Sequence, residues 1–252
     1  MAKGSNNTPR TRNSKVASGS PKVVKEKYVQ QREDQINSSP IRPLNAKQKL
    51  YMDMINDWNI PTVLSTGYAG TSKTYLPTAM ACDWLRTGKI DKLIFSRPNI
   101  SNTKSLGAFG GDLLEKMSNW CMPILGVLHE RLGRNNVELL IKAGDIEFVP
   151  LEVIKGFSAS NCVFIMDEAE DLTIEEAKKV ITRQGKGCKM ILCGDVSQSE
   201  LKERSGLKKL MEMAEKYDYL TLGTVDFNET SDIVRSDAVK NWIIAFNEEE
   251  NK

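Results

Sequence analysis

The sequence predicts an α/β fold with a mainly parallel sheet and helices on both faces of that sheet. Short, continuous apolar runs recur along the chain, at residues 62–67, 92–98, 145–152, 161–168, 189–195 and 219–223. Strands covered on both faces give such runs, whereas half-buried strands alternate polar and apolar residues. Segments with helical spacing lie between several of the runs, and this alternation is typical of a doubly wound sheet.

The expected helices follow from apolar residues at helical spacing. They occupy residues 44–58, 74–88, 110–133, 173–185 and 206–217. A proline-marked break separates the first helix from the strand at 62–67. The second helix contains Pro77, which lacks a backbone N–H and tends to kink a helix. In a sheet of this class, ligands bind at the carboxyl ends of the strands.

Length and composition favour a globular protein. The 252 residues suffice for one sizeable α/β domain with appendages, and 40% hydrophobic with 27% charged residues is ordinary for soluble proteins. No apolar run approaches the roughly 20 residues that span a bilayer. The polar, basic N-terminus lacks the apolar region of a secretory signal. We therefore expect a cytoplasmic location and no membrane contact.

Cysteine and histidine usage argues against a zinc cluster or a disulfide framework. The five cysteines are widely spaced without a CxxC pair, and the chain has one histidine. Cys162 and Cys193 lie in apolar runs, which favours buried, inert thiols.

Three parts are expected along the chain: a basic arm at residues 1–40, a folded domain at 41–246 and an acidic tail at 247–252. The arm is polar and lacks apolar periodicity, so it cannot bury enough surface to offset the entropy of ordering. Residues 1–47 hold ten basic and three acidic side chains. A disordered arm of this charge attracts phosphate backbones through counterion release, while a solubilising tail explains it nearly as well.

The stretch STGYAGTSKT at residues 65–74 indicates a phosphate-binding loop. It fits GxxxxGK[ST] except that Ser72 replaces the glycine before the lysine, and it lies between a strand and a helix as the motif requires. Lys73 would reach the β and γ oxygens, and the Thr74 hydroxyl would hold Mg²⁺. The residues expected to bind nucleotide are Gly67, Tyr68, Ala69, Gly70, Thr71, Ser72, Lys73 and Thr74. Alone, the imperfect motif leaves a coincidental match open.

Two further polar clusters follow apolar strands. Asp167 and Glu168 end such a strand, where unpaired charge is costly, so a functional role is favoured. Asp167 would bind Mg²⁺ through water, and Glu168 would polarise the attacking water. In CGDVSQ, Asp195 and Gln198 end the next strand, and the Gln198 amide would sense the γ-phosphate or position water. A solvated acidic cluster is the alternative, but three motifs at three strand ends reinforce one another.

Single residues carry weaker predictions. Gln48 lies ahead of the loop, where its amide would read the adenine edge or simply face solvent. Arg235 would stabilise developing charge on the γ-phosphate as an arginine finger, and a surface charge explains it equally well. Arg97 ends a strand on the ligand edge, within reach of nucleotide or nucleic-acid phosphate.

These motifs together resemble the PhoH-family ATPases, a helicase-like P-loop group, and in particular the short single-domain forms that bacteriophages carry. The resemblance covers roughly residues 40 to 245. It rests on STGYAGTSKTYL, SRPNISNTKSLGAFGGDLLEKM, CVFIMDEAEDLTIEEAKKVITRQGKGCKMILCGDVSQ and the SGL at 205–207.

The resemblance implies a RecA-like core that binds and hydrolyses ATP with Mg²⁺ and assembles into a ring, expected to be a hexamer. Adenine, phosphate, magnesium, catalytic, sensor and arginine-finger roles fall on Gln48, Lys73, Thr74, Asp167, Glu168, Gln198 and Arg235. In a ring, Arg235 would serve the neighbouring subunit's ATP, so isolated monomers would hydrolyse slowly. If the chain is phage-encoded, its location is the host cytoplasm.

Four positions depart from the pattern of that family. Ser72 replaces a glycine, Pro77 lies in the helix after the loop, and Ser236 replaces a histidine that commonly follows the finger arginine. The AFGG at 108–111 lacks the usual proline before glycine. These departures bear on hydrolysis rate and local geometry rather than on the fold.

Two functional hypotheses stay open. The first is an ATPase whose hydrolysis is coupled to RNA or single-stranded DNA, with the arm and Arg97 contributing contacts. The second is a nucleotide-dependent assembly or scaffold protein with little turnover. A nuclease is disfavoured because residues 1–40 are too few and too poor in carboxylates for a metal-dependent site. Strand separation is not expected of an isolated chain, since one such core per chain must assemble before it can pull on a strand.

Overall fold

The computed structural model describes residues 1, 36–98, 113–151, 154 and 159–250. It divides the chain into two compact units, Met1–Gln35 and Ile36–Lys252. Residues 2–35 of the predicted arm lie outside the described residues, as does the predicted family stretch at 99–112. The second unit holds the sheet and the helices.

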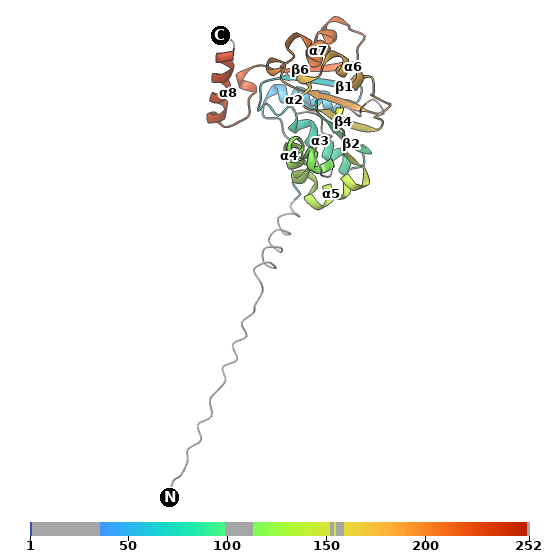
Figure 1. The fold of residues 1–252 in the computed structure, drawn as a ribbon, viewed down its shortest axis with the longest axis vertical. Coiled ribbons are helices and arrows are strands. Elements are labelled where there is room, and N and C mark those ends of the chain that lie inside the picture. The colour runs from blue at the N-terminus through green and yellow to red at the C-terminus, as the bar shows by residue number, and fades with distance from the viewer. Residues whose placement is uncertain (2–35, 99–112, 152–153, 155–158, 251–252) are drawn as a thin grey trace. The chain divides into compact units, whose positions relative to one another are not determined.

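The centre of the second unit is a six-stranded sheet whose paired strands are all parallel (Figure 1). Its spatial order is β3-β2-β4-β5-β1-β6. The strands are β1 (Thr62–Gly67), β2 (Lys92–Ser96), β3 (Ile146–Phe148), β4 (Cys162–Met166), β5 (Lys189–Cys193) and β6 (Leu222–Phe227). The predicted α/β class with a mainly parallel sheet is confirmed.

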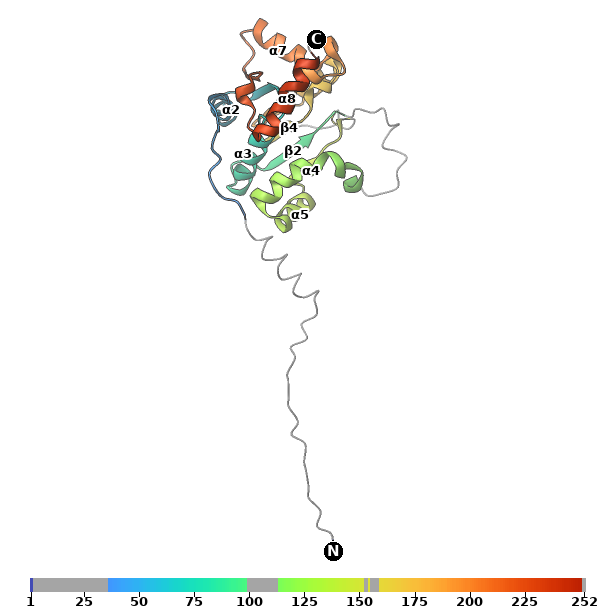
Figure 2. The same cartoon turned by 90° about the vertical axis from the view of Figure 1, so that its left-hand side faces the viewer.

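Helices cover both faces of the sheet (Figures 1 and 2). One face packs against α2 (Ala46–Asn56), α3 (Tyr75–Arg86), α4 (Leu113–Leu132) and α5 (Arg134–Ala143). The other face packs against α6 (Ile174–Ile181) and α7 (Gly206–Lys216). Alternate residues of a strand enter different cores: Val63 of β1 belongs to the first and Leu64 to the second. This two-sided burial explains the continuous apolar runs.

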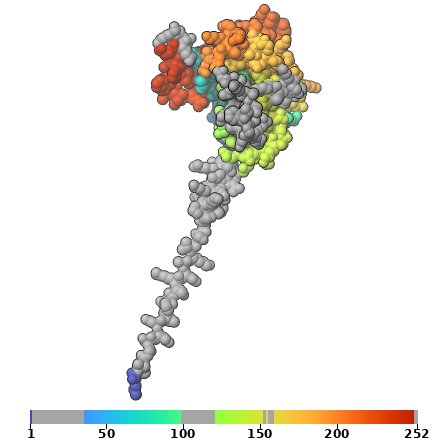
Figure 3. All heavy atoms as spheres, in the orientation of Figure 1, coloured from blue at the N-terminus to red at the C-terminus, as the bar shows by residue number. Residues whose placement is uncertain are grey.

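Short helices complete the fold. The 3₁₀ turns are η3 (Ala169–Asp171), η4 (Val196–Gln198), η5 (Lys202–Arg204) and η6 (Thr230–Asp232). The chain then forms α8 (Asp237–Glu250), which takes in residues 247–250 of the predicted acidic tail. In Figures 1 and 3, α8 stands to one side of the sheet and its covering helices. Within the described part of the chain, no helix combines the length and apolar character needed to cross a bilayer.

The last strand was predicted in the wrong place. The apolar run at 219–223 suggested a strand, but β6 runs from Leu222 to Phe227. β6 is the edge strand beside β1, and its residues alternate between buried and more exposed. A half-buried edge strand does not give a continuous apolar run, which explains why the run at 219–223 overlaps β6 only at residues 222–223.

Pro77 does not interrupt its helix. It is the third residue of α3, which continues unbroken to Arg86. The first N–H groups of a helix lack helical acceptors inside the helix, so proline is tolerated best there. Pro77 therefore does not end the helix, although its missing N–H leaves the preceding loop with one donor fewer.

Candidate nucleotide-binding site

A cleft of about 570 Å³ lies where the phosphate loop and the carboxyl ends of several strands meet. It is lined by residues 69–74 after β1, by Asp167 and Glu168 after β4, and by Gly194, Asp195 and Gln198 after β5. Arg97 after β2 and Arg235 beyond β6 complete its polar wall. The strand-end motifs of the sequence therefore meet in one place, as parallel strands require. Its apolar lining includes Leu44, Pro123, Ile124, Val127 and Val234.

The phosphate loop adopts the left-handed backbone conformations that its glycine-rich motif implies. Gly67 has φ 112° and packs so closely on the Phe227 carbonyl that a Cβ would collide with it. Gly70 has φ 78°, and Ser72, which stands where the motif has glycine, has φ 72°. A non-glycine residue pays a steric cost in this region, so the loop holds Ser72 in a strained conformation.

The Lys73 side chain folds back onto the first residues of the phosphate loop. Its ammonium donates to the carbonyl oxygens of Gly67 at 2.5 Å and Tyr68 at 2.7 Å. Burial lowers the pKa of Lys73, while Asp195 and other acidic neighbours oppose that shift. The cleft thus contains a partly desolvated lysine, whose charge would interact with phosphate more strongly than in water.

Thr74 and Asp167 meet in the cleft although 93 residues separate them. The Thr74 hydroxyl donates to Asp167 Oδ1 at 2.6 Å. Burial raises the pKa of Asp167, and the bond from Thr74 opposes the shift. A hydroxyl and a carboxylate oxygen are hard ligands of the kind Mg²⁺ takes, and a cation would compensate the buried carboxylate. This donor set fits Mg²⁺ bound together with a nucleotide.

Glu168 is placed by an unusual backbone. It has φ 50° and ψ 43°, a left-handed conformation, as the chain turns from β4 into η3. Strained conformations of this kind concentrate at functional sites. Its carboxylate lies 3.2 Å from the Arg97 guanidinium, and the Glu168 side chain is 40% exposed. Behind it, burial and the neighbouring Glu168 raise the pKa of Glu170 to about 9, so Glu170 is neutral near pH 7.

Gln198 reaches the cleft from η4. Its amide nitrogen donates to Asp195 Oδ2 at 3.0 Å, and the same carboxylate accepts from the Ser197 backbone N–H through Oδ1 at 3.1 Å. Asp195 therefore fixes the turn that presents Gln198. This arrangement agrees with the expectation that both residues project toward the ligand edge.

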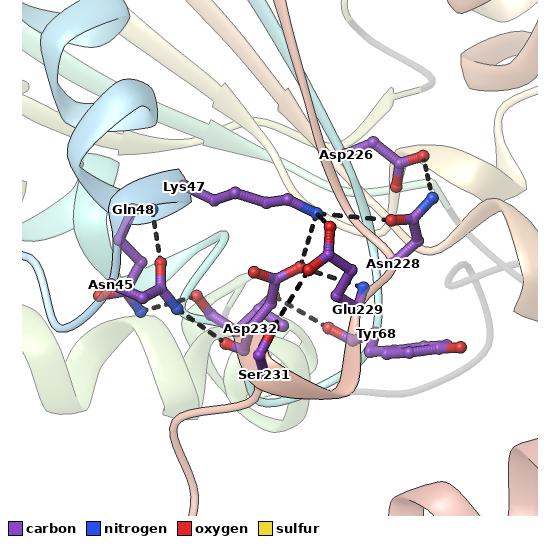
Figure 4. A network of polar contacts seen from close by, with 10 residues as sticks. Asn45, Lys47, Gln48, Tyr68, Asp226, Asn228, Glu229, Ser231 and Asp232 are labelled. Atoms are coloured by element: carbon purple, nitrogen blue, oxygen red, sulfur yellow. Dashed lines mark hydrogen bonds and ion pairs between the residues drawn. The ribbon is translucent and has the colours of Figure 1, made fainter.

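A polar network positions the segment that carries Arg235 (Figure 4). Lys47 at the start of α2 pairs with Asp232 at 2.9 Å and with Glu229 at 3.1 Å. The Asn45 amide donates to the Asp232 carbonyl oxygen at 3.3 Å, while its own oxygen caps α2. Sequence reasoning missed these three contacts, since they join residues more than 180 apart.

Arg235 comes shortly after Asp232 in the sequence and lies in the cleft of its own chain. The Val234 N–H donates to the Gly70 carbonyl oxygen at 3.0 Å. A Cβ at Gly70 would lie 2.7 Å from Arg235 Cγ, so glycine leaves room for the arginine. The structure thus places Arg235 beside the phosphate loop of the same chain.

Gln48 supports the loop rather than lining the cleft. It is 1% exposed, its amide nitrogen donates to the Thr71 carbonyl at 3.1 Å, and its oxygen accepts from the Leu44 N–H at 2.8 Å. Both ends of its amide are therefore engaged by the protein. Its role in reading adenine stays a prediction. Gly67 and Tyr68 likewise lie outside the cleft lining, while the other predicted site residues lie in it.

The parallel sheet, the phosphate loop after β1 and the acidic end of β4 together define the RecA-like fold of P-loop NTPases. Comparison with known proteins agrees. The family described as PhoH-like protein matches residues 40–247. The chain belongs to this family.

Curated relatives and a solved structure support the same assignment. A PhoH-like protein of Bacillus subtilis is 37% identical over 189 residues, which cover 74% of this chain and 58% of that protein. Protein PhoH of Escherichia coli is 31% identical over 207 residues, covering 81% and 57%. The chain thus spans little more than half the length of these relatives. The large terminase of a thermophilic bacteriophage shares the fold, with TM-score 0.50, 11% identity, and coverage of 80% of this chain and 50% of the terminase.

Proposed function

We propose that this chain binds ATP with Mg²⁺ in the cleft and hydrolyses it. The observation that carries the proposal is the 2.6 Å contact between Thr74 and Asp167, which joins the end of the phosphate loop to the acidic end of β4. Lys73, Glu168, Gln198 and Arg235 line the same cleft. Phosphoryl transfer depends on such positioning and charge stabilisation.

Each polar group has a proposed role. The backbone of residues 69–74 would surround the phosphates. The Lys73 ammonium would leave the carbonyl oxygens of Gly67 and Tyr68 and donate to phosphate oxygens instead. Thr74 and Asp167 would hold Mg²⁺, which neutralises charge on the phosphates when bound. Glu168 would orient and polarise the attacking water, and Gln198 would contact that water or the γ-phosphate.

Two arginines in the cleft have proposed roles, one in coupling hydrolysis to a partner and one in stabilising charge on the γ-phosphate. Arg97 pairs with Glu168, so the water-activating carboxylate is available only when this ion pair opens. RNA or single-stranded DNA is the proposed partner, because a phosphate backbone would compete with Glu168 for Arg97. Arg235 would stabilise charge on the γ-phosphate, and its place in the cleft allows it to do so within its own chain.

Ring assembly remains part of the proposal. Among the side chains of residues 237–249 in α8, none is buried. Trp242 is 67% and Phe246 is 62% exposed, and their rings lie 5.9 Å apart. An amphipathic helix normally buries its apolar face, so the exposed rings of α8 support the proposal that copies of this chain associate through this helix. Mass measurement with and without ATP tests this, and a monomer under both conditions would contradict it.

The hydrolysis assay addresses the proposed chemistry. ATP turnover by the unaltered chain is measured with and without RNA, beside Glu168→Gln, which keeps the shape but removes the charge. We expect turnover to fall by about 100-fold or more in the variant, because general-base contributions start at about this size, and to rise with RNA in the unaltered chain. Equal rates for the two proteins would show that Glu168 is not the catalytic group.

A nucleotide-dependent scaffold with little turnover is the second candidate. The Arg97–Glu168 ion pair favours it, because that pair occupies the proposed catalytic carboxylate. In that case ATP binds and the oligomer forms, but turnover stays at the level of Glu168→Gln with or without RNA. The same assay therefore separates the two candidates.

A further inference from the structure

The carbonyl group of Lys73 lies where helix α3 should supply a hydrogen-bond donor and does not. The Leu76 N–H donates to the Ser72 carbonyl at 3.1 Å, and the Thr78 N–H donates to the Thr74 carbonyl at 3.3 Å. Between these two bonds, the Lys73 carbonyl would accept from residue 77 in an ordinary helix. Residue 77 is proline, which has no N–H.

Two buried side chains from other elements donate to that carbonyl instead. Tyr51 Oη of α2 lies 3.0 Å from Lys73 O, and Cys193 Sγ at the end of β5 lies 3.2 Å from it. Tyr51 is 0% and Cys193 is 1% exposed. A buried carbonyl without a donor is costly, so these contacts offset the missing bond.

The two donors are themselves fixed in place and in protonation state. The Ser65 hydroxyl of β1 donates to Tyr51 Oη at 3.1 Å, which leaves the tyrosine proton for Lys73. The Tyr51 ring packs edge-on against Phe227, with centroids 5.6 Å apart. Burial raises the pKa of Cys193 to about 12 and the pKa of Tyr51 well above its usual value, so both groups keep their protons at neutral pH.

We propose that Tyr51 and Cys193 are positioning residues for nucleotide binding: they hold the Lys73 backbone, and through it the phosphate loop, by replacing the helical donor that Pro77 lacks. This inference rests on the proposed function, since it assigns a role in holding the lysine that would contact phosphate. Cys193 would then have a positioning role, whereas the sequence suggested only an inert buried thiol.

Restoring the missing N–H provides the test. Tyr51→Phe and Cys193→Ala each remove one donor to the Lys73 carbonyl, and Pro77→Ala adds the helical donor back. The dissociation constant of ATP with Mg²⁺ is measured for each single variant and for each change combined with Pro77→Ala. We expect the single variants to bind about tenfold more weakly, as for loss of a bond to a buried carbonyl. In the Pro77→Ala background, the same changes should weaken binding by less than about twofold.

Controls separate positioning from general loss of structure. Ser65→Ala removes the hydrogen bond that orients Tyr51 but leaves both donors to Lys73, so it should weaken binding less than Tyr51→Phe does. Cys193→Ser keeps a donor and should bind more tightly than Cys193→Ala. Urea unfolding of the same set gives a readout independent of nucleotide, and Pro77→Ala should reduce the stability lost in Tyr51→Phe.

The outcomes distinguish this inference from the function on which it rests. If the unaltered chain binds ATP and the losses are equal with proline or alanine at position 77, the positioning role is overturned while nucleotide binding stands. If the unaltered chain binds no ATP, the proposed function fails and the inference fails with it.

Discussion

Ser72 departs from the phosphate-loop motif and still adopts the backbone conformation that the motif requires. Its φ of 72° lies in the region that the motif normally reserves for glycine. The Ser72 carbonyl still accepts the Leu76 N–H at 3.1 Å, so the helix begins normally. For a residue with a Cβ, this conformation costs about 1–2 kcal/mol. The loop therefore has the shape of a phosphate cradle at some cost in stability.

Substitution at position 72 should reveal that strain. Ser72→Gly removes the steric cost but gains freedom in the unfolded chain, whereas Ser72→Ala keeps the strain and loses the hydroxyl. We expect the glycine variant to be more stable than the alanine variant by about 1 kcal/mol in urea unfolding. At Lys178, which is exposed on α6, Lys178→Ala should be more stable than Lys178→Gly, because alanine is the better helix former. Greater stability for Ser72→Ala than for Ser72→Gly would show that the loop is unstrained.

At the scale of elements, the interior strands and the edge strand β3 were predictable, because each lies within an expected apolar run, whereas the edge strand β6 was not. β1, β2, β4 and β5 lie in the sheet interior, and each falls within a predicted apolar run. β6 lies at the edge, alternates in burial and was misplaced. α5 and α8 were not predicted at all. Apolar spacing alone does not predict these two helices, because helix formation depends more on packing against other elements or partners.

The junction of β5 and α2 gives a prediction about pH. The Lys189 ammonium donates to the carbonyl oxygens of Met54, Asp57 and Ile60 at 2.7, 2.8 and 2.5 Å, where α2 ends. Burial lowers the pKa of Lys189 to about 8 from its ordinary value of 10.5. Below pH 8 both folded and unfolded chains carry the charge, and the cost of burying it is fully present.

As pH rises from about 8 to 10.5, the folded chain releases this proton first, so that cost is removed and stability increases. We therefore expect the free energy of unfolding of the unaltered chain to rise over this window relative to Lys189→Met, which has no titrating group at this position. Exposed Lys209→Met should follow the unaltered chain throughout. A constant difference between the unaltered chain and Lys189→Met would mean that Lys189 keeps its ordinary pKa.

For the whole molecule, the sequence could place the principal site residues because a parallel sheet gathers its strand ends. Lys73, Thr74, Asp167 and Glu168 line one cleft as that rule implies. The residues that support them were not predictable. Tyr51 and Cys193 look like ordinary core residues in the sequence, and their proposed role depends on contacts with the Lys73 carbonyl across 22 and 120 residues. The Arg97–Glu168 ion pair likewise arises only when β2 and β4 pair.

The central claim is that this cleft binds ATP through its phosphate loop. Titration calorimetry of ATP with Mg²⁺ into the unaltered chain, Lys73→Met and Lys209→Met tests it most directly. Lys209 is exposed on α7 and is not among the residues that line the cleft, so its variant controls for loss of a positive charge. We predict binding by the unaltered chain and by Lys209→Met, and affinity at least about tenfold weaker for Lys73→Met, because a charge-assisted contact is lost. Equal affinity for Lys73→Met and the unaltered chain would contradict the assignment of the loop.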